Sequence, residues 1–250
     1  GRGITDQGKI FGTAEDSEGR IYLNPQSWAI LSGAADQQQI AAMNNAIAEQ
    51  LQTPFGLMML APSYTQMRED IGRLTQKYPG VAENGSIYNH AAIFYVFSLY
   101  QIGQAEQAFS IIEQMLPNHQ DVEQRQQLPS FIPNYYRGAY HQLPEMAGRS
   151  SQLFNTGTVA WLYRCLIEEF CGLKGIAGAL YIEPKLPKNI DALTVTKNYL
   201  GAIFKVNISK DPAVAQSTAF FAEQRLENNR FTKITAGETY RIKVLIPAHG

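Results

Sequence analysis

Hydrophobic positions recur with a helical period over the first two thirds of the chain. After Asp36, which stands where a helix needs an N-cap, the apolar side chains Ile40, Met43, Ile47 and Leu51 are three or four positions apart. Similar spacing predicts further helices that begin near Pro25, run from Asn89 to about Ile102, from Gln104 to Leu116, and from Thr158 to about Cys171. The first part of the chain is therefore expected to be helical.

The period changes near residues 172–178, and the rest of the chain is typical of β-structure. Its short apolar segments are rich in β-branched and aromatic residues and are separated by Gly, Pro, Asn and Asp: ALYIEP, ALTVTKNYL, AIFKVNIS, TAFFAEQR, RFTKIT and TYRIKVLIP. Asn228-Asn229 is predicted to form a hairpin turn. We expect a small all-β domain built of two packed sheets.

Two long stretches between the predicted helices, residues 53–88 and 117–154, contain many Pro and Gly residues. Loops of this length in a compact domain are usually functional. Helices that alternate with long loops suit a ring of paired helices whose loops form a cleft. The predicted helices would make about half of such a ring, so we expect the chain to be the C-terminal part of a larger protein.

Composition excludes several classes of partner. The 21 basic and 22 acidic residues among 250 leave a net charge of −1, which gives no attraction to nucleic acid or to an acidic membrane surface. No window has the roughly 18 continuous apolar residues that a membrane-spanning helix needs, and no apolar segment of a signal peptide follows GRGITDQGK.

The two cysteines, Cys165 and Cys171, are six positions apart in a predicted helix. This spacing does not suit a disulfide, so we expect two reduced thiols in a cytoplasmic protein. The sequence has no CxxC motif and no Cys/His cluster, so no metal site and no cofactor are predicted.

A glutamate and a histidine frame the stretch ENGSIYNH, residues 83–90, directly before the apolar segment AAIFYVFSLY. Such a stretch can begin and cap a helix, or it can place Glu83 and His90 in a binding site. The pattern alone leaves both interpretations open.

Two other places have side chains suited to anions. Thr156-Gly157-Thr158 precedes an apolar helix, where free N–H groups, hydroxyls and the helix dipole can bind phosphate; the alternative is an ordinary Thr N-cap. Arg73 and Lys77 are four positions apart. If their turn is helical, both point to one side and can hold a carboxylate; otherwise they form a solvated surface pair.

Motifs for the common hydrolases are absent from the sequence. It contains no GxSxG and no HExxH, and its carboxylates are scattered, so a glycosidase pair cannot be named from the residues alone.

Five stretches of the sequence resemble the inverting disaccharide phosphorylases of the cellobiose and chitobiose phosphorylase type, glycoside hydrolase family 94. They span most of residues 10–187: GRIYLNPQSWAILSGAAD, YPGVAENGSIYNHAAIF, IPNYYRGAYHQ, AGRSSQLFNTGTVAWLYRCLIE and GLKGIAGALYIEPKLP. The resemblance implies an α+β multidomain protein. Residues 1–177 would form the later part of an (α/α)6 barrel, and residues 178–250 a C-terminal antiparallel β-sandwich.

The resemblance also implies a reaction and roles for residues. Inorganic phosphate, the co-substrate, attacks the anomeric carbon with inversion while one carboxylic acid protonates the leaving oxygen. His90, Thr156 and Gly157 match the phosphate-binding residues, and Glu83 matches a residue that contacts the acceptor sugar. Gln142 of AYHQ matches a sugar-binding glutamine. The Trp-Asn-Asp segment that holds the general acid is not found in this sequence, so the acid is expected upstream and no catalytic residue is predicted here.

The spacing of Arg73 and Lys77 ahead of ENG resembles the branch of the family that acts on cellobionic acid, 4-O-β-D-glucosyl-D-gluconate. The expected products are α-D-glucose 1-phosphate and D-gluconate, with N,N′-diacetylchitobiose or cellobiose as alternative substrates. A non-catalytic carbohydrate-binding protein is the alternative from another class. The resemblance further implies a homodimer whose site is completed by the N-terminal remainder of the enzyme.

Overall fold

The computed structural model describes residues 1–116, 122–126, 131–152, 154 and 156–248. They form two compact units, one of Gly1–Ile102 with Gln107–Leu162 and one of Gly103–Glu106 with Tyr163–Gly250. The chain mixes helices and sheets, which confirms the α+β class. The predicted division into residues 1–177 and 178–250 stays a prediction.

Except for a short helix at Val122–Arg125, which falls in a stretch predicted to be irregular, the helices lie close to where the hydrophobic spacing predicted them. They are α1 (Leu23–Leu31), α2 (Gln37–Gln50), α3 (Asn89–Gln101), α4 (Ala105–Met115), the short α5 (Val122–Arg125) and α6 (Thr158–Cys165), which continues as a π-helical turn (Leu166–Phe170). The start of α1 was predicted two residues late, because its first turn already includes Leu23 and Asn24 ahead of the proline.

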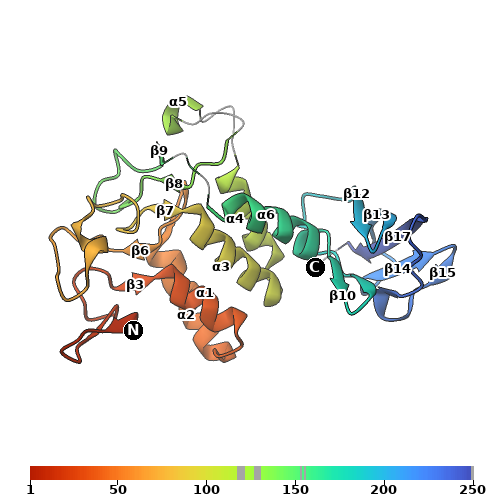
Figure 1. Ribbon diagram of the computed structural model, residues 1–250, viewed down its shortest axis with the longest axis horizontal. Helices are drawn as coiled ribbons and strands as arrows, with labels where there is room; N and C mark the ends of the chain where they lie inside the picture. Colours follow the sequence, from red (N-terminus) through yellow and green to blue (C-terminus); the bar gives the residue numbers. More distant parts are fainter. Residues whose placement is uncertain (117–121, 127–130, 153, 155, 249–250) are drawn as a thin grey trace. The chain divides into compact units, whose positions relative to one another are not determined.

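Helix α3 is the centre of the first unit. Ten of its thirteen residues are buried, and it packs along α1 (Figure 1). In contrast, α2 buries only Ile47 and begins with a capping box, in which Asp36 accepts from the N–H of Gln39 and the Gln39 side chain accepts from the N–H of Asp36. Because α3 is enclosed, its first turn is held in place by the structure around it.

The long stretches predicted as irregular contain short strands. Strand β3 (Ile21–Tyr22) pairs with β6 (Leu60–Ala61), and β4 (Gln52–Thr53) pairs with β5 (Gly56–Leu57). A three-stranded sheet joins β7 (Ile87–Tyr88), β8 (Tyr135–Tyr136) and β9 (Ser150–Ser151). Strands of two residues are too short to show a period in the sequence, yet the last sheet fixes both long stretches beside the start of α3. A further pair, β1 (Gly3–Ile4) with β2 (Ile10–Phe11), lies at the N-terminus.

The second unit carries the longer strands. One sheet has the order β10 (Leu173–Ile176), β11 (Ala179–Ile182), β16 (Arg230–Phe231); the other has the order β12 (Ala192–Tyr199), β13 (Ala202–Asp211), β17 (Thr239–Pro247), β14 (Thr218–Phe221), β15 (Gln224–Arg225). Strands β13 and β17 run parallel, so the prediction of a wholly antiparallel arrangement is wrong at this pair. The segment between them carries β14, β15 and β16. It is long enough to bring the chain back to the starting edge, so that β17 can run in the same direction as β13.

The hairpin predicted at Asn228-Asn229 is also wrong. Both residues have positive φ, as a tight turn requires, but they join β15 to β16, which belong to different sheets. The Asn229 side chain accepts from the N–H of Ala219 and donates to the carbonyl of Ser217, so it holds this crossing in place.

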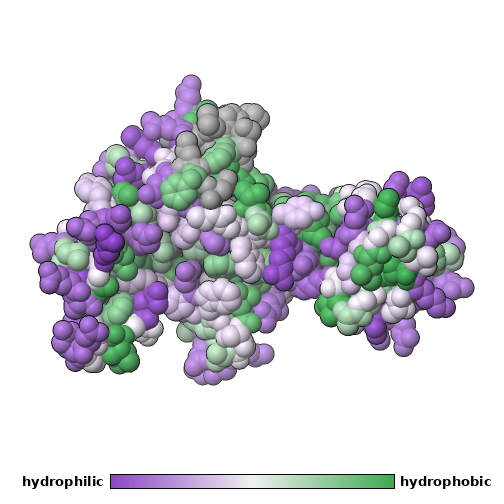
Figure 2. All heavy atoms as spheres, in the orientation of Figure 1, coloured by the Kyte–Doolittle hydropathy of each residue, from purple (hydrophilic) through white to green (hydrophobic). Residues whose placement is uncertain are grey.

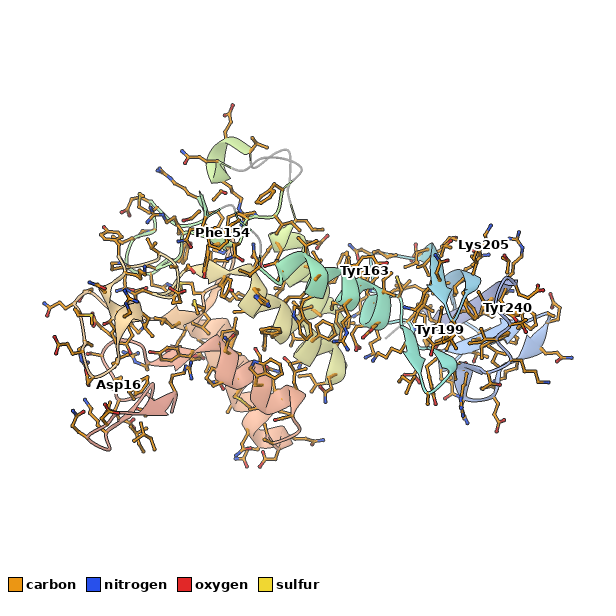
Figure 3. The ribbon with its side chains drawn as sticks, viewed as in Figure 1. Asp16, Phe154, Tyr163, Tyr199, Lys205 and Tyr240 are labelled. Carbon is orange, nitrogen blue, oxygen red and sulfur yellow. The ribbon has the colours of Figure 1, made fainter. Side chains whose placement is uncertain are left out.

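Aromatic rings from the two sheets of the second unit contact each other. Phe231 of β16 lies 5.5 Å from Phe204 and 4.6 Å from Tyr240 between ring centroids. Tyr240 and the exposed Lys205 are labelled in Figure 3. On the visible face of this unit, hydrophobic residues lie together and hydrophilic residues surround them (Figure 2). Its exposed large apolar side chains include Ile176, Leu200 and Ile203.

Both cysteines are buried and unbridged. Burial raises the pKa of Cys165 to about 12 and that of Cys171 to about 11, so neither thiol is activated at neutral pH. Within the part of the chain that the structure describes, the helices are too short or too polar to cross a membrane.

Candidate functional site

The start of α3 is fixed to the irregular segment that precedes β8. The side chain of Asn89 donates to the carbonyl of Pro133 at 2.8 Å, and its N–H donates to the carbonyl of Asn134 at 3.2 Å. No side chain caps the helix at Tyr88. The helix therefore begins at Asn89 as predicted, but the polar residues there bind a neighbouring segment instead of capping the helix.

His90 and Thr156, predicted together as phosphate ligands, are brought into contact. Nδ1 of His90 lies 3.1 Å from Oγ1 of Thr156, although 66 positions separate them in the chain. The Thr156 hydroxyl donates to Oδ1 of the buried Asn134 at 3.0 Å. Thr156 thus bonds to neighbouring segments, which argues against an ordinary N-cap. Leu153 and Asn155 of the same predicted motif lie outside the described residues.

Gly157 lies against the other nitrogen of His90. A Cβ at Gly157 would lie 2.5 Å from Nε2, closer than packed atoms approach, so a larger residue here would have to displace the imidazole. Nε2 is buried and has no hydrogen-bond partner among the described residues. Helix α6 begins directly after Gly157, and its first N–H groups have no carbonyl of their own helix to bond.

Aromatic side chains enclose the imidazole. The ring centroid of Phe94 lies 4.9 Å from that of His90, and Trp161 of α6 lies 5.0 Å from Phe94. Burial lowers the pKa of His90, so the ring is neutral at pH 7 and carries one N–H. A neutral donor beside a helix start can bind an anion. Phe154, which precedes α6 in the chain, is 60% exposed and is labelled in Figure 3.

Tyr88 contacts His90 on one side and a second tyrosine, Tyr135, on the other. The Tyr88 hydroxyl lies 3.3 Å from Nδ1 of His90 and 3.4 Å from Oγ1 of Thr156. Its ring stacks on Tyr135 at 4.4 Å between centroids. Burial, and then the neighbouring Tyr88 and Glu83, raise the pKa of Tyr135. Sequence reasoning missed these tyrosines, because nothing in a pattern shows that β7 and β8 pair Tyr88 with Tyr135.

Asn84 holds the loop that presents Glu83. Its fully buried side chain accepts from the N–H of Tyr64 at 2.8 Å and donates to the carbonyls of Tyr64 and Lys77 at 2.8 and 2.7 Å. Glu83 itself is exposed. The buried amide of Asn84 therefore ties the residue after Glu83 to the backbone of Lys77 and of Tyr64.

Arg73 and Lys77 do not share an α-helical turn. The turn Arg73–Gln76 is a 3₁₀ helix, and Lys77 leaves it in an extended conformation with φ −70° and ψ 146°. An α-helical spacing of four therefore does not apply. Both side chains are exposed, and the structure gives neither of them an ion pair within its described part. Their shared role in carboxylate binding stays a prediction.

Gln142 braces a loop. Its Oε1 accepts from the N–H of Ser63 at 2.7 Å and its Nε2 donates to the carbonyl of Ser63 at 3.1 Å. It borders a cavity of about 360 Å³ that also includes Arg20, Glu49 and His141. Because both polar ends are occupied by backbone groups, its predicted contact with sugar stays a prediction. Among the described residues there is no group of three or more His, Cys, Asp or Glu that could hold a metal ion.

Comparison with known proteins gives one family. The glycosyl hydrolase 94 superfamily, catalytic domain, matches residues 1–172. The chain is 51% identical over 98% of its length to a cellobionic acid phosphorylase from Neurospora crassa, covering 31% of that protein. It is 35% identical to a 3-O-β-D-glucopyranosyl-β-D-glucuronide phosphorylase from Paenibacillus borealis and 30% identical to an N,N′-diacetylchitobiose phosphorylase from Vibrio proteolyticus. Each of these two matches covers 86% of this chain, and 28% and 27% of the respective relatives. The chain thus spans less than a third of these relatives.

Proposed function

Because the chain belongs to the glycosyl hydrolase 94 superfamily, we propose that it is part of an inverting disaccharide phosphorylase, an enzyme that transfers a hexosyl group to phosphate. Residues 1–177 would be the later part of its (α/α)6 barrel and residues 178–250 its C-terminal β-sandwich. The long stretches that meet at the β7-β8-β9 sheet would then line the cleft of that barrel.

One observation carries the proposal most strongly. His90, Thr156 and Gly157 come from two distant segments and meet beside the start of α6, with the Nε2 atom of a neutral imidazole left for a ligand. Donors without partners at a helix N-terminus suit inorganic phosphate. These three residues form the phosphate site of the proposed enzyme.

The chemistry needs little else from this chain. A phosphate oxygen forms a bond to the anomeric carbon while the bond from that carbon to the leaving sugar oxygen breaks. A general acid then supplies the proton to that oxygen. The residues around His90 hold the nucleophile and orient it below the sugar ring. We assign the general acid to an aspartate in a part of the enzyme outside these residues.

Cellobionic acid is the substrate that the chain suits best, giving α-D-glucose 1-phosphate and D-gluconate. The two most similar relatives described above are named for substrates that carry a carboxylate, a cellobionic acid and a glucuronide. Arg73 and Lys77 supply two cations in the segment that Asn84 ties to Glu83. Cations recognise a carboxylate, and a neutral acceptor gives no reason for them. Glu83 and Gln142 would contact the sugar hydroxyls.

The whole enzyme is proposed to be a homodimer, as the family resemblance implies, and to be located in the cytoplasm. The buried, unbridged thiols of Cys165 and Cys171 are compatible with a reducing compartment.

The test uses the full-length natural protein with inorganic phosphate and three substrates: cellobionic acid, cellobiose and N,N′-diacetylchitobiose. Release of glucose 1-phosphate with a clear preference for cellobionic acid supports the proposal. Preference for either neutral disaccharide overturns the choice of substrate. Binding of these sugars without phosphorolysis would instead identify a non-catalytic carbohydrate-binding protein.

A further inference from the structure

We propose that the five-stranded sheet of the second unit binds a short acidic oligosaccharide, on the face that points away from the aromatic core of that unit. The inference goes beyond the proposed phosphorylase activity and does not depend on it, because all of its residues belong to the second unit. Its basis is a cavity, a group of cations without counter-ions and an aromatic ring, which share this one face.

Alternation along β17 separates the two faces of the sheet. Ile242 and Val244 are buried, whereas Arg241 and Lys243, between and before them in the strand, are exposed. A cavity of about 480 Å³ lies on the exposed face, between this strand and the hairpin of β14 and β15. Its volume is in the range of small-molecule sites, so the face offers more than a flat surface.

The register of the strands places further cations on this face. Lys205 of β13, labelled in Figure 3, is the partner of Arg241. Phe220 of β14 pairs with Lys243 on one side and with Arg225 of β15 on the other. Neighbouring strands are about 4.8 Å apart, so the three spacings from β13 to β15 spread these cations over roughly 14 Å. A matching ligand needs more than one negative group.

The positive charge of this face is unbalanced. Its four basic side chains are exposed, and none of them forms an ion pair with the residues that the structure describes. Lys205 and Arg241, at partner positions on neighbouring strands, repel each other. Elsewhere in the same unit, cations are neutralised: Lys174 and Lys185 both pair with Glu169. An anionic ligand would neutralise the cations of the sheet face in the same way.

The neutral side chains of this face favour a saccharide over other anions. Phe220 is half-buried and provides an apolar surface for a sugar ring, while the exposed Asn207 and Thr239 can bond hydroxyl groups. Arg241 can bind a carboxylate through two parallel hydrogen bonds. An extended acidic peptide would instead add to an edge strand, β12 or β15. A chain of net charge −1 gives nucleic acid no general attraction.

Glu223 allows a test of the sign of the interaction. This exposed acidic residue lines the same cavity as Arg241 and Lys243. Its charge would repel a bound carboxylate, so removing it should strengthen binding. Removing the charges of Arg241 and Lys243 should weaken binding. Substitutions that only disturb the shape of the cavity would not act in opposite directions.

The experiment measures binding of trigalacturonate to the full-length enzyme by titration calorimetry, with the neutral trimer cellotriose for comparison. The wild type should bind trigalacturonate at least about tenfold more tightly than cellotriose, and less tightly at high salt. The double substitution Arg241→Gln with Lys243→Gln should raise the Kd for trigalacturonate roughly tenfold. Glu223→Gln should lower it about two- to threefold. Lys9→Gln, which removes an exposed cation of the first unit, should leave it unchanged.

A melting curve of the double variant separates binding from structure. Its melting temperature should equal or exceed that of the wild type, because the repulsion between Arg241 and Lys205 is gone. A clear fall would assign these cations a structural role and overturn the inference.

The remaining outcomes are separable. The inference fails if the wild type does not prefer trigalacturonate, if the double variant binds it equally well, or if Lys77→Ala removes the binding instead. Equal binding of hexaglutamate through the same cations would show recognition of charge alone and overturn the saccharide. Phosphorolysis is measured in parallel and should be unchanged in the double variant. Its absence in the wild type would refute the proposed function and leave this inference standing.

Discussion

The residues proposed for phosphate and those proposed for the acceptor differ in how far the chain itself fixes them. His90 is enclosed by Phe94 and bonded at Nδ1, and Gly157 leaves no space for even a methyl group beside it. Arg73 and Lys77 are exposed, and the structure shows no ion pair for them within its described part. The phosphate side is preorganised, whereas the cations stand in solvent on a well-anchored loop.

This difference predicts different sensitivities. A preorganised anion site depends on donors that are held within tenths of an ångström, so small changes of shape have large effects. Exposed cations are screened and pay side-chain entropy to hold a ligand, so each contributes modestly. Substitutions on the two sides should therefore differ in size and in the substrate that they affect.

The largest effect is expected from Gly157→Ala. The added Cβ would meet Nε2 of His90 at 2.5 Å and displace the donor, lowering kcat/KM for phosphate by roughly 100-fold. Steady-state kinetics of the full-length enzyme measure this. Gly33→Ala is a matched control: it strains a positive φ in open space and should lower stability by about 1 kcal/mol without changing phosphate kinetics. Equal kinetic losses in both variants would refute the steric argument.

Asn84→Ala tests the anchor of the acceptor loop. The substitution leaves the buried N–H and C=O of Tyr64 and the C=O of Lys77 without this partner, so the free energy of unfolding should fall by roughly 2–3 kcal/mol. Thermal or urea unfolding measures the change. The exposed Asn198→Ala should lie within about 0.5 kcal/mol of the wild type. A stability loss no larger than that of the control would show that Asn84 does not fix the loop.

Lys77→Ala should have the smallest effect, and it should depend on the substrate. Losing one exposed cation is expected to raise the KM for cellobionic acid roughly five- to tenfold, and less at high salt. The KM for cellobiose, which has no carboxylate, should not change. Lys233→Ala in the second unit, also exposed, serves as the control. The assignment fails if the two disaccharides are affected alike.

Much of the fold could be predicted because the hydrophobic positions of a helix repeat over several turns. The spacing along α2, α3 and α4 gave their positions, and the change of pattern near residue 172 gave the strands. The short strands β3 to β9 could not be predicted, since two residues show no alternation and their partners lie far away in sequence. The parallel pairing of β13 with β17 and the crossing at Asn229 depend likewise on tertiary contacts.

The candidate site residues could be proposed from sequence patterns, but the contacts among them could not. Thr156 and Gly157 could be found from the chemistry of a helix start, and His90 from its place before an apolar helix. The pairing of Tyr88 with Tyr135 comes from β-sheet register, and the 3₁₀ turn before Lys77 comes from the way Thr75 and Asn84 tie that loop. Neither leaves a signal in the sequence.

The most direct test of the account is phosphate binding to the full-length enzyme, measured by titration calorimetry for the wild type and for His90→Ala. The account predicts that the variant binds inorganic phosphate at least about tenfold more weakly, while gluconate binding stays within about twofold of the wild type. Equal phosphate affinity in the two proteins would contradict the assignment of His90, Thr156 and Gly157 as the phosphate site.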